Sequence, residues 1–185
     1  PGAGKSTLAK ALDELPGWTA INFGATVRER AAAADPLGDR IRNHRAHRAR
    51  VHGPERKPGA WLPDDLCAEI LRSIYPTFSY QFLALDGFPK MRSQSLLLER
   101  SEWLLLGAVH LKISEATQRR RILDRGRSGD AAGTDLVLRP EDTPDGLAAR
   151  MIDWNQDTYP LVEQFAKRGE LTEIDAEQST EHIVE

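Results

Sequence analysis

The first seven residues constrain the fold more than any other stretch of the chain. They read Pro-Gly-Ala-Gly-Lys-Ser-Thr and match the end of the phosphate-binding pattern G-x-x-x-x-G-K-[ST], whose opening glycine would lie two residues before Pro1. Glycines let successive backbone N–H groups curl around phosphate oxygens. Lys5 can reach the β- and γ-phosphates, the Ser6 hydroxyl can bind Mg²⁺, and the helix that follows directs its positive end at the same anion. We therefore favour a phosphate-binding loop over a plain glycine-rich turn.

Length and composition favour one soluble α/β domain. The chain has 185 residues, of which 40% are hydrophobic and 29% charged, and its net charge of -3 gives no overall attraction to nucleic acid or membrane. The single cysteine, Cys67, excludes an intramolecular disulfide and a cysteine-rich zinc site. The longest apolar run, around residues 104–109, is far shorter than the roughly 20 residues of a membrane span. No signal peptide is visible, so we expect a cytoplasmic protein.

The start of the chain suggests a truncation. There is no initiator Met, and no strand precedes the phosphate loop, although such a loop normally joins a strand to a helix. We expect residue 1 to be a truncation point and the C-terminus, near residues 182–184, to end inside a helix.

Strand and helix patterns alternate along the chain. Strands are predicted at residues 19–23, 81–85, 108–113 and 171–175. Helices are predicted after the phosphate loop, at about 26–34, through the basic stretch to about 51, from 63 to before Pro76, at 93–105, from 115, around Arg150, and up to Arg168. This order indicates a parallel sheet with helices on both faces.

The stretch from residue 40 to 57 is strongly basic and has two interpretations. Its cations are Arg40, Arg42, Arg45, Arg48, Arg50, Arg56 and Lys57, interleaved with His44, His47 and His52. It could bind nucleic acid, or it could be a solvated helix face that helps to gather anionic nucleotides. It lacks aromatic residues for stacking bases, and the domain is acidic overall, so we favour the solvated face and expect no nucleic-acid partner.

Asp86 ends the second predicted strand, in the sequence Asp-Gly-Phe-Pro-Lys. A carboxylate at a strand end beside a phosphate loop is where a Mg²⁺-bound water is held. The alternative is a turn aspartate that caps the next segment. The phosphate loop makes the metal role the better interpretation.

Four arginines surround a glycine-rich stretch without a core pattern, residues 126–138, which we predict to be a mobile loop. They are Arg121, Arg125, Arg139 and Arg150. Arginines hold oxyanions through paired N–H donors, and phosphoryl transfer depends on positioning and electrostatic stabilisation. A closing loop would exclude water. The alternative is a set of surface salt bridges with Glu115, Asp124, Glu141 and Asp142.

These elements together make the chain similar to adenylate kinases and the wider nucleoside monophosphate kinase family. The resemblance rests on residues 1–7, Gly24 with Arg28, residues 62–66, Asp86-Gly87-Phe88-Pro89, Gln94, residues 121–126 and 139–142, Arg150, and residues 158–161. It implies reversible transfer of the γ-phosphoryl group of Mg–ATP to AMP by a P-loop NTPase fold. That fold is a three-layer α/β/α arrangement with a parallel sheet, whose first central strand is missing from this chain.

The resemblance also implies roles for individual residues. The ATP site would comprise Gly2, Ala3, Gly4, Lys5, Ser6, Thr7 and Arg121, which stacks on the adenine. The monophosphate site would comprise Phe23, Gly24, Arg28, Ala60, Trp61, Leu62, Gly87, Lys90 and Gln94, with Gln94 reading the base. The catalytic residues would be Lys5, Lys90, Arg125, Arg139 and Arg150. Ser6 would bind Mg²⁺ and Asp86 a Mg²⁺-bound water.

The resemblance further divides the single domain into a core of residues 1–23, 63–125 and 139–185, a moving monophosphate-binding segment, 24–62, and a lid, 126–138. It implies a monomer. The lid is longer than in short-lid relatives and lacks the four cysteines of zinc-lid relatives, so we expect no structural metal there.

The chain departs from the family pattern at several positions. Lys90 replaces an arginine, which keeps the charge but loses the paired donors. Phe23 replaces a threonine that touches the adenine, which could favour stacking and a different base. Glu141-Asp142 replaces two aspartates, a mild change. These changes leave two alternatives open: a kinase for another nucleoside monophosphate, or a nucleotide-binding sensor with weak catalysis.

The missing strand gives a structural prediction. The family's sheet order places that strand in the centre, so the strands around Leu83 and Val109 should flank a gap of about 10 Å, two strand spacings.

Overall fold

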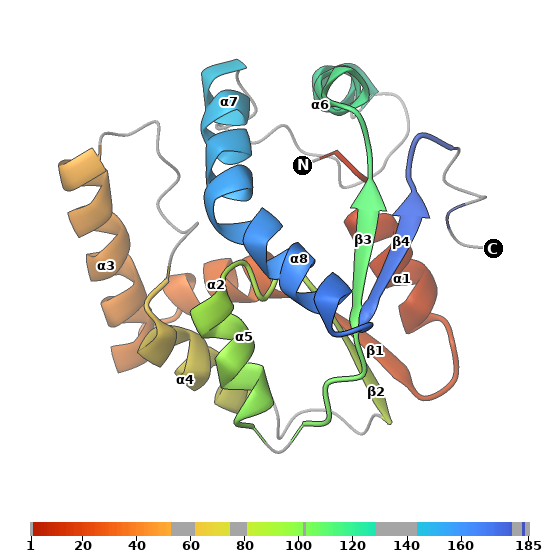
Figure 1. Ribbon diagram of the computed structural model, residues 1–185. Coiled ribbons are helices and arrows are strands. Elements are labelled where there is room, and N and C mark those ends of the chain that lie inside the picture. Colours follow the sequence, from red (N-terminus) through yellow and green to blue (C-terminus); the bar gives the residue numbers. More distant parts are fainter. Residues whose placement is uncertain are drawn as a thin grey trace.

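The computed structural model describes residues 2–52, 62–74, 81–101, 103–128, 144–178 and 183. Its helices are α1 Lys5–Asp13, α2 Phe23–Ala32, α3 Pro36–His52, α4 Asp64–Ile74, α5 Arg92–Glu99, α6 Glu115–Ser128, α7 Pro144–Asp153, the π-helix η2 Trp154–Thr158 and α8 Tyr159–Lys167. Its strands are β1 Trp18–Asn22, β2 Phe82–Asp86, β3 Ala108–Lys112 and β4 Leu171–Asp175. Strands and helices alternate along the chain (Figure 1), which confirms the α/β class.

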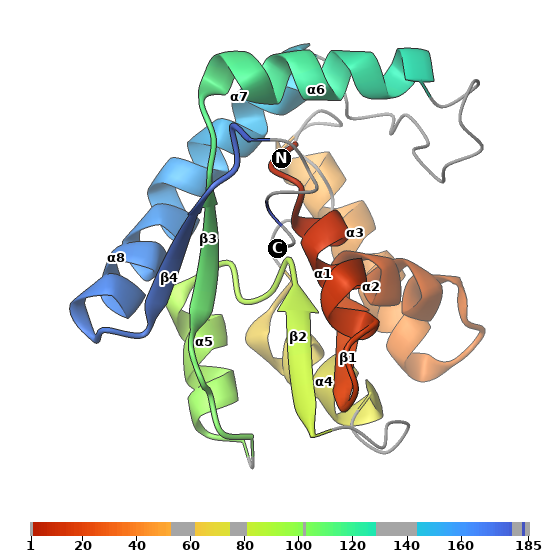
Figure 2. The same ribbon diagram turned by 90° about the vertical axis from the view of Figure 1, so that its right-hand side faces the viewer.

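The four described strands form two parallel pairs. β1 pairs with β2, with Asn22 opposite Asp86, and β3 pairs with β4, with His110 opposite Glu173. The arrows of β2 and β3 point the same way (Figure 2), yet the two strands belong to separate sheets. The predicted single parallel sheet is therefore not formed by these strands alone. A further strand between β2 and β3 remains a prediction.

The larger hydrophobic core joins the β1–β2 pair to α2, α3, α4 and α5. Its most enclosed side chains are Ile41, Cys67 and Ile70, each 0% exposed. A smaller cluster of Ala3, Leu111, Ala176 and Ile183 connects the phosphate loop to the β3–β4 pair. The loop is therefore packed against the second sheet as well as leading into α1.

Helix α2 begins three residues earlier than the sequence predicted. Asn22 ends β1, and its Oδ1 accepts a hydrogen bond from the Ala25 N–H at 2.8 Å. Asparagine is a strong N-cap because its side chain satisfies a backbone donor that the first turn leaves unpaired. Phe23 consequently lies in the first turn of α2 and not at the end of a strand.

Helix α5 is shorter than predicted and ends at Glu99 rather than near residue 105. The Ser101 hydroxyl donates to the Leu98 carbonyl at 2.6 Å and accepts from the Trp103 N–H at 3.2 Å. Such local bonds compete with the helical ones. Residues 103–107 are not helical, and Leu104 and Leu106 are 83% and 65% exposed.

Several other predicted boundaries agree closely with the structure. Helix α3 ends one residue beyond the expected Val51, α8 ends before Gly169, whose φ is +71°, and β4 covers the predicted residues. Helix α6 continues through Ser128, so the first three residues of the predicted lid are helical. Residues 129–143 lie outside the described part of the chain, as do Ala60, Trp61 and most of the predicted C-terminal helix.

Of the helices described, none combines the length and the apolar character needed to cross a membrane.

Candidate active site

The phosphate loop turns directly into α1. Gly2 and Gly4 have φ angles of +72° and +88°, a left-handed conformation that side chains other than glycine rarely adopt. The Gly4 carbonyl accepts from the Leu8 N–H, which closes the first turn of α1. A Cβ on Gly2 would lie 3.2 Å from the Gln118 carbonyl oxygen, so the loop also passes close to α6. The exposed side chains of Lys5 and Ser6 stand at the N-terminus of α1, where the helix favours an anion.

Asp86 lies at the end of β2 beside this loop and is 9% exposed. Its Oδ2 accepts hydrogen bonds from the Ser6 hydroxyl at 2.9 Å and from Asn22 Nδ2 at 2.7 Å. The structure thus brings together the two residues predicted at the Mg²⁺ site. Carboxylate and hydroxyl oxygens are ligands that suit this ion. Asn22 was missed by the sequence reading, although a polar residue at the end of the neighbouring strand was the available signal.

Gly24 and Arg28 lie together at the start of α2. A Cβ on Gly24 would lie 3.6 Å from Arg28 Nη1 and 3.4 Å from Asn22 Oδ1. The Asn22 side chain contacts both Asp86 and the first turn of α2. It therefore connects the predicted metal carboxylate to the helix that carries the predicted monophosphate-binding arginine.

Phe23 packs into the core. Its ring centroid lies 4.4 Å from that of Phe88, and each residue is 5% exposed. In this arrangement the ring contacts Phe88 and is not open to a base.

The backbone of Lys90 forms a hydrogen bond with the side chain of Gln94. The Lys90 N–H donates to Gln94 Oε1 at 2.9 Å, and the Thr158 hydroxyl of η2 donates to the Lys90 carbonyl at 2.9 Å. Gln94 is 3% exposed, and Leu62, at the end of the predicted monophosphate segment, is 4% exposed. Gly87, with φ at +80°, turns the chain between Asp86 and this group.

Cys67 completes this group and was considered in the sequence only for disulfides and zinc. Gln94 Nε2 donates to its sulfur at 3.7 Å, and the thiol donates to the Leu62 carbonyl at 3.7 Å. Burial, followed by the charge of Asp64, raises the pKa of the Cys67 thiol to about 12. The sulfur is therefore protonated at neutral pH and able to donate.

The predicted arginine clamp is only partly visible in the described residues. Arg121 donates to the Gln178 carbonyl at 3.1 Å, and Arg150 Nε donates to the Gly146 carbonyl at 3.2 Å. Arg125 lies on α6, but its side chain is outside the described part, and Arg139 is outside it altogether. The clamp of four arginines therefore stays a prediction.

Arg45, on α3, is a further cation near the predicted monophosphate site. Burial, and then the positive charge of Arg28, lower the pKa of its guanidinium. In the part of the chain that is described, Arg45 Nε is buried and makes no hydrogen bond. Two neighbouring guanidinium groups repel each other, and an anion bound between them would relieve that repulsion.

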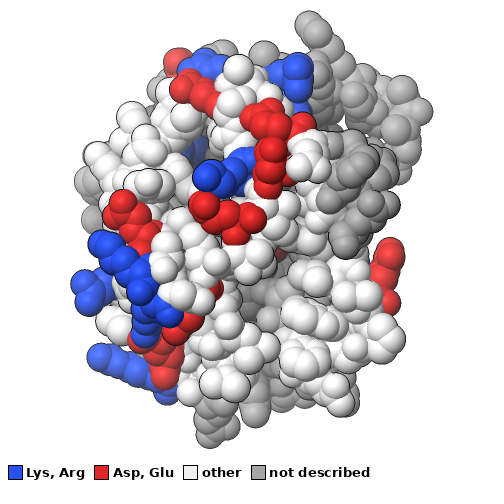
Figure 3. All heavy atoms as spheres, turned by 45° about the vertical axis from the view of Figure 1, so that its right-hand side comes forward, with Lys and Arg blue, Asp and Glu red and all other residues white. Residues whose placement is uncertain are grey.

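Other cations of the basic stretch are paired with carboxylates. Arg40 binds Asp65 at 2.6 Å and also Glu69, which fastens α3 to α4, and Arg42 binds Asp39. These pairs support the interpretation of a solvated helix face. On a different face, which Figure 3 brings forward, Lys and Arg side chains also lie next to Asp and Glu side chains.

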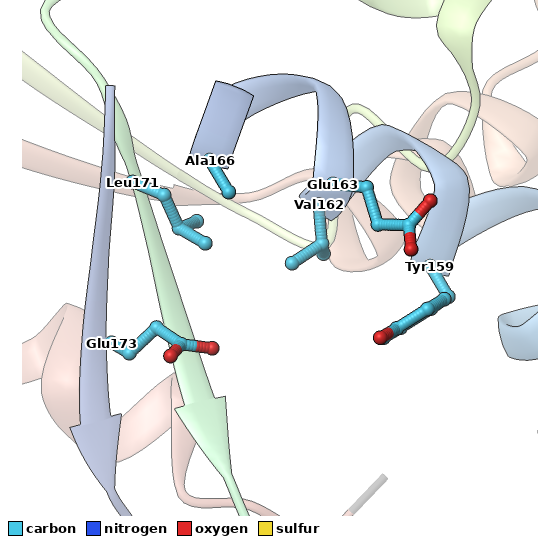
Figure 4. A pocket seen from close by; sticks show the side chains of 6 residues that line it. All are labelled: Tyr159, Val162, Glu163, Ala166, Leu171 and Glu173. Carbon is cyan, nitrogen blue, oxygen red and sulfur yellow. The ribbon is translucent and has the colours of Figure 1, made fainter. Parts of the chain in front are cut away.

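A shallow hollow of about 260 Å³ lies elsewhere, between α8 and β4 (Figure 4). It is lined by Tyr159, Val162, Glu163, Ala166, Leu171 and Glu173. Glu173 is already paired with His110 at 3.2 Å and Lys112 at 3.4 Å. None of the lining residues belongs to the site that the sequence predicts.

Comparison with curated proteins finds several similar chains that carry the name adenylate kinase. That of Thermus thermophilus is 30% identical over 179 residues, which cover 95% of this chain and 84% of the relative. That of Rhizobium meliloti is 31% identical, with 95% and 87% covered, and that of Deinococcus radiodurans is 26% identical, with 100% and 89% covered. A search against protein-family models gives no match.

Proposed function

Because the chain belongs to the adenylate kinase family and is a nucleoside monophosphate kinase, we propose that it transfers the γ-phosphoryl group of ATP reversibly to AMP at the phosphate loop. The observation that carries this proposal is the contact between Ser6 at the loop and Asp86 at the end of β2. It places a hydroxyl and a carboxylate beside a helix N-terminus, which is the arrangement that a metal-bound triphosphate requires.

The donor nucleotide binds at the loop. The backbone N–H groups of residues 2–7 hold the ATP phosphates, Lys5 neutralises their charge, and Arg121 stacks on the adenine. Ser6 binds Mg²⁺ directly and Asp86 through a water. When bound, Mg²⁺ neutralises the charge of the phosphates. The hydrogen bond from Asn22 supports this assignment, because it holds the carboxylate at a fixed position beside the loop.

The acceptor binds on the other side of Asp86. Arg28 and Lys90 hold the phosphate of AMP, and Gln94 reads its base. The remaining acceptor residues lie around these three and are Phe23, Gly24, Ala60, Trp61, Leu62 and Gly87. The proximity of Gly24 to the Arg28 guanidinium, which a Cβ on Gly24 would meet at 3.6 Å, supports this assignment.

Positively charged side chains lower the barrier to the phosphoryl transfer. Lys5, Lys90, Arg125, Arg139 and Arg150 stabilise the phosphoryl group as it moves between the two nucleotides. The segment 24–62 closes over AMP and the lid 126–138 over ATP, while residues 1–23, 63–125 and 139–185 remain as the core. Closure excludes water and limits hydrolysis of ATP.

The test measures ADP formation from Mg–ATP with AMP, dAMP, CMP, UMP and GMP as acceptors. Turnover with AMP in clear preference to the others is expected. Preference for another base would retain the mechanism, and a role for Phe23 in base choice would then require its ring to leave the contact with Phe88. Tight ATP binding without turnover on any acceptor would contradict the proposal in favour of a nucleotide sensor.

We further propose a three-layer fold in which an additional parallel strand lies between β2 and β3. The separation of these strands into two sheets supports it. Adding a strand-forming segment and the opening glycine of the loop ahead of Pro1 should raise the unfolding midpoint; an unchanged midpoint would count against it. We also propose that the protein is a monomer, that it acts in the cytoplasm and that its ligands are nucleotides.

A further inference from the structure

We propose that Cys67 is a positioning residue that fixes the orientation of the Gln94 side-chain amide and thereby helps this kinase to select a 6-amino base over a 6-oxo base. The inference rests on the proposed function, in which Gln94 reads the base of the acceptor. It goes further because it assigns the base preference to a second residue, one that need not touch the nucleotide.

A side-chain amide alone does not distinguish these bases. Adenine presents an acceptor at N1 and a donor at the 6-amino group, whereas a 6-oxopurine presents a donor at N1 and an acceptor at O6. An amide that can rotate by 180° pairs with either edge, because it carries one carbonyl oxygen and one NH₂ group. Discrimination therefore requires that the amide be held in one orientation.

Two contacts hold the Gln94 amide. The Lys90 backbone N–H can only donate, so the group that faces it at 2.9 Å must be the carbonyl oxygen Oε1. Nε2 then faces Cys67 Sγ at 3.7 Å and donates to it. One N–H of Nε2 and one lone pair of Oε1 remain for a ligand. When the amide orientation is fixed, the Nε2 donor can pair with N1 of adenine and the Oε1 acceptor with its 6-amino group.

Cys67 is itself held in place. Its thiol donates to the Leu62 carbonyl at 3.7 Å, so the sulfur lone pairs stay directed away from that carbonyl and can accept from Gln94. The residue is 0% exposed, on the buried face of α4. A residue with a purely apolar side chain would fill this space but would leave Nε2 without an acceptor in a buried environment, which favours rotation or displacement of the amide.

The experiment compares AMP with inosine monophosphate, which differs from AMP at position 6 and in the N1 proton. Wild-type protein, Cys67→Val and Cys67→Ser are assayed for kcat and KM with each acceptor. We expect Cys67→Val to raise the KM for AMP about three- to tenfold with kcat nearly unchanged, since one weak hydrogen bond is lost. The ratio of kcat/KM for AMP to that for inosine monophosphate should fall by a similar factor. Cys67→Ser keeps an acceptor and should retain most of the wild-type ratio.

Ile70→Val is the matched control. Ile70 lies on the same helix, is also 0% exposed and belongs to the same core cluster. This variant should lose stability without changing the ratio. If it lowers the ratio as much as Cys67→Val, or if Cys67→Val leaves the ratio unchanged while the wild type prefers AMP, the inference is wrong and the proposed function stands. A wild type that phosphorylates neither acceptor overturns the proposed function itself.

Discussion

The Ser6 hydroxyl donates a hydrogen bond to Asp86 Oδ2 at 2.9 Å across 80 positions of the chain. The contact forms because α1 packs on β1 and β2, which brings the phosphate loop to the carboxyl end of β2. Ligands of parallel α/β sheets bind at this end of the strands. The contact therefore supports the phosphate loop, rather than the hollow between α8 and β4, as the site of the proposed reaction.

Removing the charge of Asp86 tests the metal assignment. Asp86→Asn keeps the size of the side chain but weakens its hold on a Mg²⁺-bound water, so kcat should fall about 100-fold or more and the Mg²⁺ concentration for half-maximal activity should rise. Titration calorimetry of Mg–ATP gives an independent measurement. Asp175→Asn, which changes the final residue of β4 in the other sheet, is the control and should change neither quantity. Equal behaviour of the two variants would refute the role of Asp86.

Neutralising Arg45 tests whether an anion binds next to Arg28. Arg45→Gln should weaken binding of AMP about three- to tenfold, because a cation near the phosphate is lost, and it should not lower stability, because repulsion between two guanidinium groups is relieved. Equilibrium binding of AMP and of inorganic phosphate measures the effect. Arg50→Gln on the same helix is the control, since the Arg50 side chain is exposed and bonds the Ala46 carbonyl. Unchanged affinity in Arg45→Gln would exclude Arg45 from the site.

The contact between Phe23 and Phe88 indicates that Phe23 packs in the core and does not contact the acceptor base. Phe23→Leu should lower the free energy of unfolding by about 1 to 2 kcal/mol, through lost burial and a lost aromatic pair, while the preference among acceptor bases stays the same. Phe82→Leu is the comparison: Phe82 also stacks, on Trp18 at 5.1 Å, but is 39% exposed and should cost less. Denaturant unfolding and the acceptor series together check this. A changed base preference in Phe23→Leu would show that the ring meets the base after all.

Glu177 should make the stability of the chain depend on acid. The Ser114 backbone N–H, the first cause, and the Thr117 hydroxyl hold the pKa of Glu177 down from 4.5 to about 2. Because the folded pKa is depressed, the stabilisation is complete above about pH 4.5 and is lost as the pH falls toward 2. Glu177→Gln should therefore melt at a lower temperature than the wild type at pH 7, and the difference should shrink as the pH falls from about 4.5 through about 2.

The control for Glu177 lies on α6, the helix whose start the Glu177 carboxylate contacts. Glu115 pairs with Arg119 at an exposed position one turn away, so Glu115→Gln should change the melting temperature little at any pH. A constant difference between Glu177→Gln and the wild type from pH 7 to 2 would show that the carboxylate charge is not what stabilises the start of α6.

The hydrophobic pattern of the sequence predicted helix and strand boundaries well where neighbouring residues alone determine them. The strand at residues 171–175 and the end of α8 before Gly169 followed from alternation and from a residue that tolerates a positive φ. Local pattern was less reliable where one side chain changes an end. The cap by Asn22 lengthened α2 at its start, and the hydroxyl of Ser101 shortened α5. Both bonds are short-range, but nothing in the hydrophobic pattern marks them.

The sequence by itself determined the α/β class and the family and predicted the phosphate loop, because the spaced glycines, Lys5 and the strand-ending Asp86 form a pattern typical of that chemistry. Only the tertiary structure decided what Phe23 and Cys67 do. Phe23 looked like a residue for contacting a base, but packing turned its ring onto Phe88. In the sequence, Cys67 excluded only a disulfide and a cysteine-rich zinc site, whereas the fold placed its sulfur against the Gln94 amide. The physical reason is that a side chain's role depends on its neighbours, and those neighbours come from distant parts of the chain.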